Sequence, residues 1–427
     1  MLRKHKREGI TLRRDLGLFD ATIAGVGIIV GAGIYVLIGA AAGHAGNGLW
    51  ISFLISAFVA YLTGLSYAEL SSIYSEDSGE YSYVEHTYGK KVAFVVGYLV
   101  ILSLIIGAAA VALGFSGYLN AFFGLSSIVP IAIVSIILFS LINFIGIRQS
   151  IKINIICTIL SLLGLIIIIV SSVPKLGKID YFDIPSFVGV LKASSLIFFA
   201  FIGFESVVKL SEETKNPRKN IPIALLLSLG ISSLIYILVG ISSISTLSWS
   251  SLATSRAPLA EVAQSAIGEY AWYIVSVIAI VSTANTVLML LIAMSRMLYS
   301  MSHDYSKLNF LSKINKRTST PHLAIMVSAL ATIAFVLVGN IEVVAEITNF
   351  SVFIVFTLIN LALIKSRYIK HRHEMFREPF NIGKFPLLAL VGFATTLLMI
   401  FNLELIVIIS GVIMTLFGFL FYRLLKT

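Results

Sequence analysis

Residues 198–209 read FFAFIGFESVVK, an apolar run that contains one glycine, Gly203, and one carboxylate, Glu205. The run lies inside the apolar segment 187–210, which is long enough to cross a lipid bilayer as a helix. A carboxylate within such a span is costly unless it is paired, protonated or hydrated. Glu205 therefore indicates either a functional site or a structural pair with a neighbouring helix.

A second apolar span also contains residues that a helix disfavours. Its centre reads AGVGIIVGAGIYVLIG over 24–39, with Gly31, Ala32 and Gly33 at mid-span. Glycine costs about 1 kcal/mol relative to alanine inside a helix, so this stretch predicts local unwinding. The alternative is close helix packing, because Gly27 and Gly31 are four residues apart and form a small face.

The composition places both stretches in a membrane protein. Of the 427 residues, 58% are hydrophobic and 12% are charged, whereas a soluble globular protein has about 25% charged residues. These values exclude a typical soluble enzyme and a disordered chain. Runs of span length predict an all-α polytopic membrane protein with twelve transmembrane helices. The predicted spans are 19–42, 49–70, 92–119, 128–147, 153–173, 187–210, 221–247, 271–299, 322–338, 341–364, 385–401 and 403–424.

The distribution of basic residues predicts the orientation of these spans. With the N-terminus inside, 27 of the 31 Lys and Arg side chains fall on the cytoplasmic side. The other 4 are Lys175, Lys178, Lys192 and Arg256. This asymmetry predicts a multi-pass protein of the cell membrane with both termini cytoplasmic. It also accounts for the net charge of +10, so the charge does not indicate a nucleic-acid partner.

The two anomalous spans open two blocks of five spans each. An odd number of spans inverts the second block relative to the first, because the first span begins inside and the sixth begins outside. This layout is typical of an inverted repeat in which two discontinuous helices meet at the membrane midplane. The predicted organisation is a basic cytoplasmic tail, 1–17, a first repeat, 18–173, a second repeat, 187–364, and two appended helices, 385–425.

Each break would expose backbone groups that bind ions. Free N–H groups at the start of a half-helix attract an anion, and free carbonyls at the end of a half-helix attract a cation. A site that offers both matches the zwitterion of an α-amino acid. No Ser/His/Asp set, metal-ligand spacing or phosphate loop is found in the sequence, so we expect no enzyme, cofactor or metal site. The single cysteine, Cys157, rules out an internal disulfide.

Four stretches carry a resemblance to a known transporter superfamily. They are GVGIIVGAGIYVLIG at 25–39, SYAELSSIYSEDSGEYSYVEHTYG at 66–89, FFAFIGFESVVKLSEETKNPRKNIPIAL at 198–225 and SRMLYSMSHDYSKLNFLSKINKRTSTP at 295–321. In these residues the chain resembles the amino acid–polyamine–organocation superfamily, and it is most similar to the cationic and neutral amino acid transporters. The resemblance implies a five-plus-five inverted repeat with broken first and sixth helices and an alternating-access cycle.

The resemblance also implies which residues bind the substrate: Ile29, Gly31, Ala32, Gly33, Phe199 and Ile202. The N–H groups of Ala32 and Gly33 would bind the carboxylate. The carbonyls of Ile29, Phe199 and Ile202 would bind the ammonium group. The Phe199 ring matches the aromatic gate over the substrate, and the alternative is an aromatic ring that faces lipid.

Ion coupling is expected close to the second break. Glu205 matches the acidic position after this break, which is implicated in proton sensing in the family. Many members have a lysine in the fifth helix where this chain has Ser161. Ser161 with Ser282 or Thr283 would offer oxygens to sodium, unless these hydroxyls only pack helices together. Lys209, four residues after Glu205, would hold Glu205 charged or else extend to the lipid headgroups.

The predicted function is secondary active transport of α-amino acids, with an amino acid substrate and a coupling proton or sodium ion. The alternatives are a polyamine or organic-cation carrier of the same fold and an exchanger without ion coupling. Apart from the lipid bilayer, no obligate protein partner is predicted. Glu69 and Arg296 are expected at the membrane interface, or else paired in an inner gate.

Overall fold

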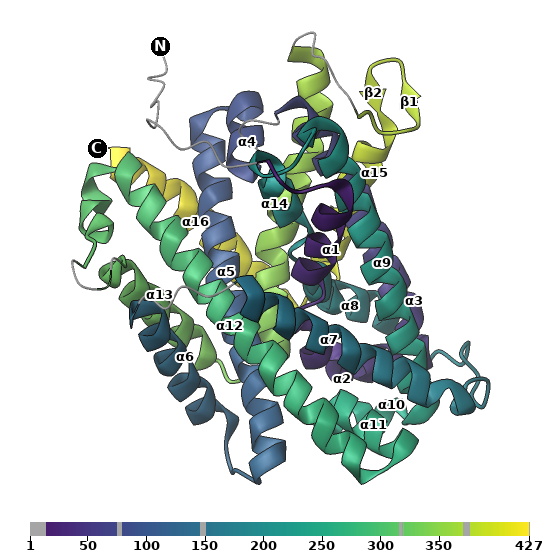
Figure 1. Ribbon diagram of the computed structural model, residues 1–427. Coiled ribbons are helices and arrows are strands. Elements are labelled where there is room, and N and C mark those ends of the chain that lie inside the picture. The colour runs from purple at the N-terminus through teal and green to yellow at the C-terminus, as the bar shows by residue number, and fades with distance from the viewer. Residues whose placement is uncertain are drawn as a thin grey trace.

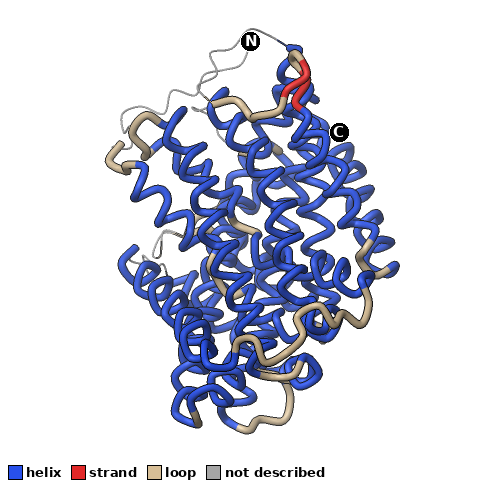
Figure 2. The backbone as a smooth tube through the Cα atoms, turned by 90° about the vertical axis from the view of Figure 1, so that its right-hand side faces the viewer, coloured by secondary structure: helices blue, strands red, loops and turns tan. Residues whose placement is uncertain are grey.

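The computed structural model describes residues 14–74, 79–145, 151–315, 318, 320–369 and 376–426. Almost all of this part of the chain is helical, and Figure 2 shows one short hairpin within it. The hairpin pairs β1 (Asn381–Ile382) with β2 (Phe385–Pro386) in antiparallel register. The prediction of an all-α architecture is confirmed.

Nine helical segments of the described chain are long and apolar enough to cross a membrane. They are Gly33–Ile73, Lys90–Phe123, Ile128–Ile145, Asn154–Lys175, Phe187–Glu212, Pro217–Thr246, Glu269–His303, Ile341–Ile369 and Leu405–Leu425. Three shorter apolar helices are Leu18–Ile29, His322–Val336 and Leu387–Phe401. These segments support a polytopic membrane protein. The count of twelve spans, the inverted repeat and its boundaries stay predictions.

The first part of the chain forms seven α-helices. They are α1 (Leu18–Ile29), α2 (Gly33–Ala45), α3 (Leu49–Ile73), α4 (Glu80–Tyr88), α5 (Lys90–Phe123), α6 (Ile128–Ile145) and α7 (Ile151–Ser172). The 3₁₀ turns η1 (Gly46–Gly48) and η2 (Val173–Lys175) follow α2 and α7. The short α4 is the one helix of this group that is polar on average, and it lies between the predicted second and third spans.

The second part begins with an interrupted helix. It contains α8 (Phe187–Ile197), the 3₁₀ helices η3 (Phe198–Phe201) and η4 (Phe204–Glu212), α9 (Pro217–Thr246), α10 (Trp249–Thr254), α11 (Pro258–Ile267), α12 (Glu269–Asp304), the 3₁₀ helix η5 (Ser306–Ser312), α13 (His322–Val336) and α14 (Ile341–Ile369). The helices α15 (Leu387–Phe401) and α16 (Leu405–Lys426) follow the hairpin. α9 starts with Pro217 at its first position, where the missing N–H is not needed.

The helix α5 runs through the centre of the bundle, where it packs against α12 and α14, while α3 pairs with α9 (Figure 1). The residues Gly107 to Ala110 of α5 are buried, and such small residues let helix backbones approach closely. At the periphery, α16 leaves Leu416 62% and Leu420 52% exposed, as expected for a helix that faces lipid.

The two ends of the molecule carry different elements. Figure 1 shows α4, the β1–β2 hairpin and the end of α16 at one end, and α10 and α11 at the other. The predicted orientation would place the first of these ends in the cytoplasm. Most of the predicted N-terminal tail, residues 1–13, lies outside the described residues.

Candidate substrate site

The first apolar span is interrupted at Val30–Ala32, as the glycines predict. Helix α1 ends at Ile29 and α2 begins at Gly33. Between them the Gly31 N–H donates to the carbonyl of Ile29 at 2.8 Å, and the helical pattern resumes when the Val36 N–H donates to Ala32 at 3.1 Å. A helix start leaves its first N–H groups without intrahelical acceptors. At this break the first N–H groups of α2 lie at its N-terminus, which is the positive end of the helix dipole.

The sixth apolar span changes geometry twice. Helix α8 gives way to η3, the backbone turns at Ile202 and Gly203, and η4 continues to Glu212. Gly203 has φ +121°, a conformation that residues with a side chain rarely adopt. A β-carbon at this position would also lie 3.1 Å from the carbonyl oxygen of Ile28. Glycine is therefore required at this turn for its backbone angle and for the close approach of α1.

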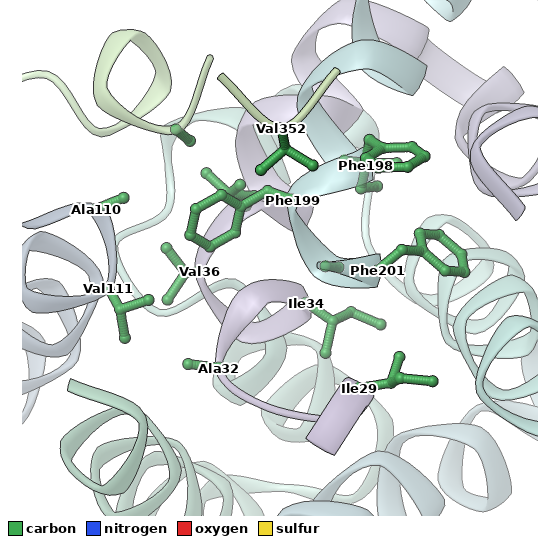
Figure 3. Packing of buried hydrophobic residues seen from close by; sticks show 14 of the residues in the cluster. Ile29, Ala32, Ile34, Val36, Ala110, Val111, Phe198, Phe199, Phe201 and Val352 are labelled. Atoms are coloured by element: carbon green, nitrogen blue, oxygen red, sulfur yellow. The ribbon is translucent and has the colours of Figure 1, made fainter. Parts of the chain in front are cut away.

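The two breaks are in direct contact. A β-carbon on Gly33 would lie 2.7 Å from the α-carbon of Ala200 in η3, so the start of α2 packs on the backbone of the sixth span. The buried hydroxyl of Tyr236 in α9 lies 2.8 Å from the carbonyl oxygen of Ile29 and 3.1 Å from that of Ala200. One side chain thus reaches the end of α1 and the end of η3. Figure 3 shows Ile29, Ala32 and Ile34 beside Phe198, Phe199 and Phe201.

The carbonyls predicted to bind the ammonium group differ in the number of hydrogen bonds that their oxygens already accept. The Ile29 oxygen accepts hydrogen bonds from both Gly31 and Tyr236. The Phe199 oxygen accepts one from the Ile202 N–H at 3.3 Å, and a carbonyl oxygen has two lone pairs. Ile202 ends this turn and is half-buried. The Phe199 oxygen thus keeps one lone pair for the predicted role, whereas the Ile29 oxygen already accepts two hydrogen bonds.

The ring of Phe199 is inside the bundle. Its side chain belongs to a residue that is 8% exposed, and Figure 3 shows the ring among Val36, Ala110, Val111 and Val352. These neighbours come from α2, α5 and α14. The alternative that Phe199 faces lipid is wrong. Its role as a gate stays a prediction.

Lys209 makes its closest ionic contact with Glu80 rather than with Glu205, although its charge still acts on the Glu205 carboxylate. The Glu205 carboxylate accepts a hydrogen bond from the Gly203 N–H at 2.9 Å, and the Lys209 ammonium lies 3.5 Å from the carboxylate of Glu80 in α4. The prediction assumed an α-helix, in which residues four apart are about 40° apart around the axis. Because η4 is a 3₁₀ helix, the same spacing turns Lys209 about 120° away from Glu205.

The hydroxyls proposed for sodium are already engaged in the protein. Ser161 and Ser282 lie with their hydroxyl oxygens 3.0 Å apart, so the fifth and eighth predicted spans touch here. The Thr283 hydroxyl donates to the Ala279 carbonyl of its own helix at 2.7 Å. The Ser161 carbonyl accepts from Tyr35 at 2.6 Å. Ser161 and Ser282 are brought together as predicted, and Thr283 is not part of the pair.

Metal binding finds no support in the described part of the chain, where no group of three His, Cys, Asp or Glu side chains lies close enough to hold an ion.

A family profile described as amino acid permease matches residues 16–422, nearly the whole chain. The chain belongs to this amino acid permease family. This permease is therefore a multi-pass membrane transporter of amino acids and not an enzyme.

Three relatives illustrate the range of proteins that this permease is similar to. The branched-chain amino acid permease of Bacillus subtilis (strain 168) is 29% identical over 436 residues, which cover 97% of this chain and 93% of the relative. The methylthioribose transporter of the same strain is 27% identical over 441 residues, with coverages of 97% and 94%. The human cationic amino acid transporter 4 is 30% identical over 386 residues, with coverages of 84% and 61%.

A buried ion pair at the α4 end of the permease was not predicted. Glu69 of α3 is fully buried, and both its oxygens accept from the guanidinium of Arg367 in α14, one of them at 2.7 Å. The partner of Glu69 is therefore Arg367 and not Arg296, which is exposed. The Glu378 N–H also donates to Glu69 at 2.9 Å. Burial and the nearby Glu69 carboxylate raise the pKa of Glu378 from 4.5 to about 7.

The roles of Tyr236 and Arg367 could hardly be predicted from the sequence. Tyr236 lies in a predominantly apolar stretch, and Arg367 is one of several basic residues that follow the apolar segment 341–364. Their partners are 207 and 298 positions away in the chain. The burial of a tyrosine hydroxyl, which needs a hydrogen-bond partner, is the only hint that the sequence offers for Tyr236.

Proposed function

We propose that this permease carries neutral α-amino acids with branched apolar side chains across the cell membrane. The main support is the contact between the two breaks, where Gly33 packs on Ala200 and Tyr236 reaches both Ile29 and Ala200. Backbone donors at the start of α2 and backbone acceptors at the end of η3 are thereby close together. A zwitterion requires this combination of opposite partial charges at one place.

The carboxylate of the substrate would bind at the start of α2. The N–H groups of Ala32 and Gly33 lie there without intrahelical acceptors, and Gly31 leaves the approach open. The nearest atom to a β-carbon on Gly31 would be the Thr286 hydroxyl, at 3.5 Å. No charged side chain is needed, because the helix dipole and two charge-assisted hydrogen bonds favour an anion.

The ammonium group would bind the carbonyls of Phe199, Ile202 and Ile29. Since a hydroxyl has a single proton to donate, Tyr236 can bond strongly to only one of its two acceptors at a time. We propose that Tyr236 donates to Ala200 when the ammonium group takes the Ile29 oxygen. Tyr236 would then keep the two breaks together in both states of the site.

The preference for an apolar side chain follows from the surroundings of Phe199. The ring is packed among Val36, Ala110, Val111 and Val352, which are all buried. A guanidinium group or a second ammonium group among such residues would lose its hydration without a compensating partner. The branched-chain permease of Bacillus subtilis, 29% identical, supports the same substrate class.

The architecture proposed for the cycle has twelve spans with both termini in the cytoplasm. Counting α1 with α2 as one broken span, α3 as the second, and the shorter α13 and α15 as spans gives this number from the helices observed. The positions of the two breaks, at the first and sixth of these spans, support a five-plus-five inverted repeat. Phe199 would close over the substrate while the two half-helices move between outward and inward states.

Coupling is proposed to depend on Glu205 and Lys209 rather than on the fifth span. The Glu205 carboxylate accepts a hydrogen bond from the Gly203 N–H at the turn of the sixth span. Its protonation would therefore change the geometry of this break. Ser161, Ser282 and Thr283 are proposed to pack helices, because each hydroxyl already has a partner within the protein. An exchange reaction without ion coupling is the alternative within the same site.

An uptake screen in proteoliposomes tests this proposal. The purified permease would be tested with the twenty amino acids and with putrescine and spermidine, with and without a pH gradient, a sodium gradient and internal amino acid. We expect uptake of leucine, isoleucine and valine above all others. Preferred uptake of arginine, lysine or a polyamine would overturn the proposed substrate class.

A further inference from the structure

A cluster of ionisable side chains joins α4 to the sixth span next to the second break. It consists of Glu80 of α4, Glu205 and Lys209 of η4, and Tyr67 of α3. Lys209 lies 3.5 Å from the Glu80 carboxylate, and Glu205 lies on the Gly203 N–H. Tyr67 is fully buried beside the rings of Phe204 and Tyr83, at 5.8 and 6.2 Å. The cluster thus connects a polar helix at one end of the molecule to the proposed substrate site.

This cluster is incompletely satisfied. The Glu80 side chain is only 6% exposed, and within the described structure its Oε1 has no hydrogen bond, although Lys209 is its ionic partner. The buried hydroxyl of Tyr67 also has no hydrogen-bond partner among the described residues. Two carboxylates share one ammonium group here, so the ionised cluster has an excess of one negative charge. Glu80 and Tyr67 are buried, whereas Glu205 is half-buried and the Lys209 side chain is 42% exposed. An unneutralised charge is therefore most costly on Glu80, unless a further cation or proton joins it.

Helices α5 and α14 pack on α4, and Arg367 of α14 is already paired with Glu69. Helix α5 follows Gly89 and begins with Lys90 and Lys91, and Lys365 of α14 lies 4.3 Å from the ring of Tyr88. Tyr88 is the last residue of α4 and Glu80 is the first, so the two ends of this helix are about 12 Å apart along its backbone. Among the described residues, Lys209 forms the ion pair with Glu80, and Glu205 and Tyr67 are close enough to interact with its charge.

We propose that Glu80 binds the coupling proton and that Lys209 holds the Glu80 carboxylate in position. A proton bound to the Glu80 carboxylate neutralises it and removes the ionic partner of Lys209. The ammonium group is then free to turn toward Glu205, whose carboxylate holds the N–H of Gly203. Protonation of Glu80 would in this way loosen the turn at Gly203. Binding of the proton would then be linked to opening of the substrate site. This inference rests on the proposed amino acid transport.

The test compares Glu80→Gln and Lys209→Met with a matched control, Glu85→Gln, on the same short helix. The reconstituted permease would be assayed with radiolabelled leucine in two modes, exchange against internal leucine and uptake driven by an inward pH gradient, over external pH 5 to 8.5. Exchange reports the substrate site without net proton movement. Gradient-driven uptake reports the coupling.

We expect Glu80→Gln to keep leucine exchange and to lose the stimulation by the pH gradient. Lys209→Met should move the midpoint of the pH profile upward, because the ionised Glu80 carboxylate loses the opposite charge that lies 3.5 Å from it. Glu85→Gln should behave like the unmodified permease. The Lys209→Met profile keeps the proposal testable if Glu80→Gln does not fold.

Two results would overturn the inference while leaving amino acid transport intact. One is full gradient stimulation in Glu80→Gln together with an unshifted pH profile in Lys209→Met. The other is leucine exchange by the unmodified permease without any stimulation by a pH gradient. Absence of leucine exchange in the unmodified permease would instead contradict the proposed substrate class.

Discussion

The hydroxyl of Tyr236 lies 2.8 Å from the carbonyl oxygen of Ile29, the last residue of α1. This contact spans two predicted halves of the permease and reaches the point at which the first span unwinds. The same hydroxyl lies 3.1 Å from the Ala200 carbonyl. A single side chain of α9 therefore bridges the two broken helices at the proposed substrate site.

Tyr236→Phe should weaken both the fold and the site. The change removes the single hydroxyl proton that the Ile29 and Ala200 carbonyls share, and a buried acceptor that loses its donor costs about 1–3 kcal/mol. We expect a lower melting temperature in detergent and a higher KM for leucine uptake in proteoliposomes. A variant with unchanged KM and stability would show that the Tyr236 hydroxyl does not hold the breaks together.

Gly33→Ala and Gly31→Ala separate packing from binding. The new β-carbon of Gly33→Ala would meet the Ala200 backbone at 2.7 Å, and such overpacking costs about 1–3 kcal/mol or more. We therefore expect loss of monodisperse protein in size-exclusion chromatography. At Gly31 the nearest atom is at 3.5 Å, so Gly31→Ala should fold.

The Gly31→Ala variant should nevertheless bind leucine more weakly, since its methyl group enters the approach to the Ala32 and Gly33 N–H groups. Thermal stabilisation by added leucine would report this loss. Normal leucine affinity in a well-folded Gly31→Ala variant would place the carboxylate elsewhere.

Replacement of external sodium by choline should leave leucine uptake unchanged, and Ser161→Ala should transport leucine at a rate close to that of the unmodified permease. The reason is that the Ser161 and Ser282 hydroxyls bond to each other at 3.0 Å and leave the Tyr35 bond to the Ser161 carbonyl in place. A sodium dependence that Ser161→Ala abolishes would contradict the packing role and assign a sodium site to these spans.

Glu378 makes the stability of the permease depend on pH near neutrality. Its pKa is raised from 4.5 to about 7, so the folded state keeps a proton that the unfolded chain has already lost in this interval. The resulting stabilisation is present below about pH 4.5 and is lost as pH rises through about 7, with a size of about 3 kcal/mol. Glu378→Gln should flatten the fall of melting temperature between pH 5 and 8, measured by scanning fluorimetry. An equally steep fall in this variant would show that another group titrates.

The places where the backbone breaks could be predicted from the sequence, because they are local. Glycine at 31, 33 and 203 weakens the helix wherever the rest of the chain lies, and the break between α1 and α2 occurs at the predicted residues. The placement of Glu205 next to a break follows from the same local pattern. Apolar periodicity likewise predicts the helices that form the body of the permease.

The partners of the charged side chains could not be predicted in the same way. The spacing of Glu205 and Lys209 predicts a pair only if η4 is an α-helix, and the observed 3₁₀ conformation lets Lys209 contact Glu80. The partner of Glu69, Arg367, is 298 positions away in the chain. Whether a charged residue in an apolar helix is paired depends on tertiary contacts that no local pattern contains.

The central claim, that the two breaks bind both ends of an α-amino acid beside an apolar pocket, is tested most directly by competition for leucine uptake. Radiolabelled leucine uptake into proteoliposomes would be measured against leucine, 4-methylpentanoate, 3-methylbutylamine, arginine and putrescine. Each charge-assisted hydrogen bond lost should weaken competition by about tenfold or more, so that only leucine itself competes well. Equal competition by 3-methylbutylamine or putrescine would show that the carboxylate is not recognised and would contradict the account.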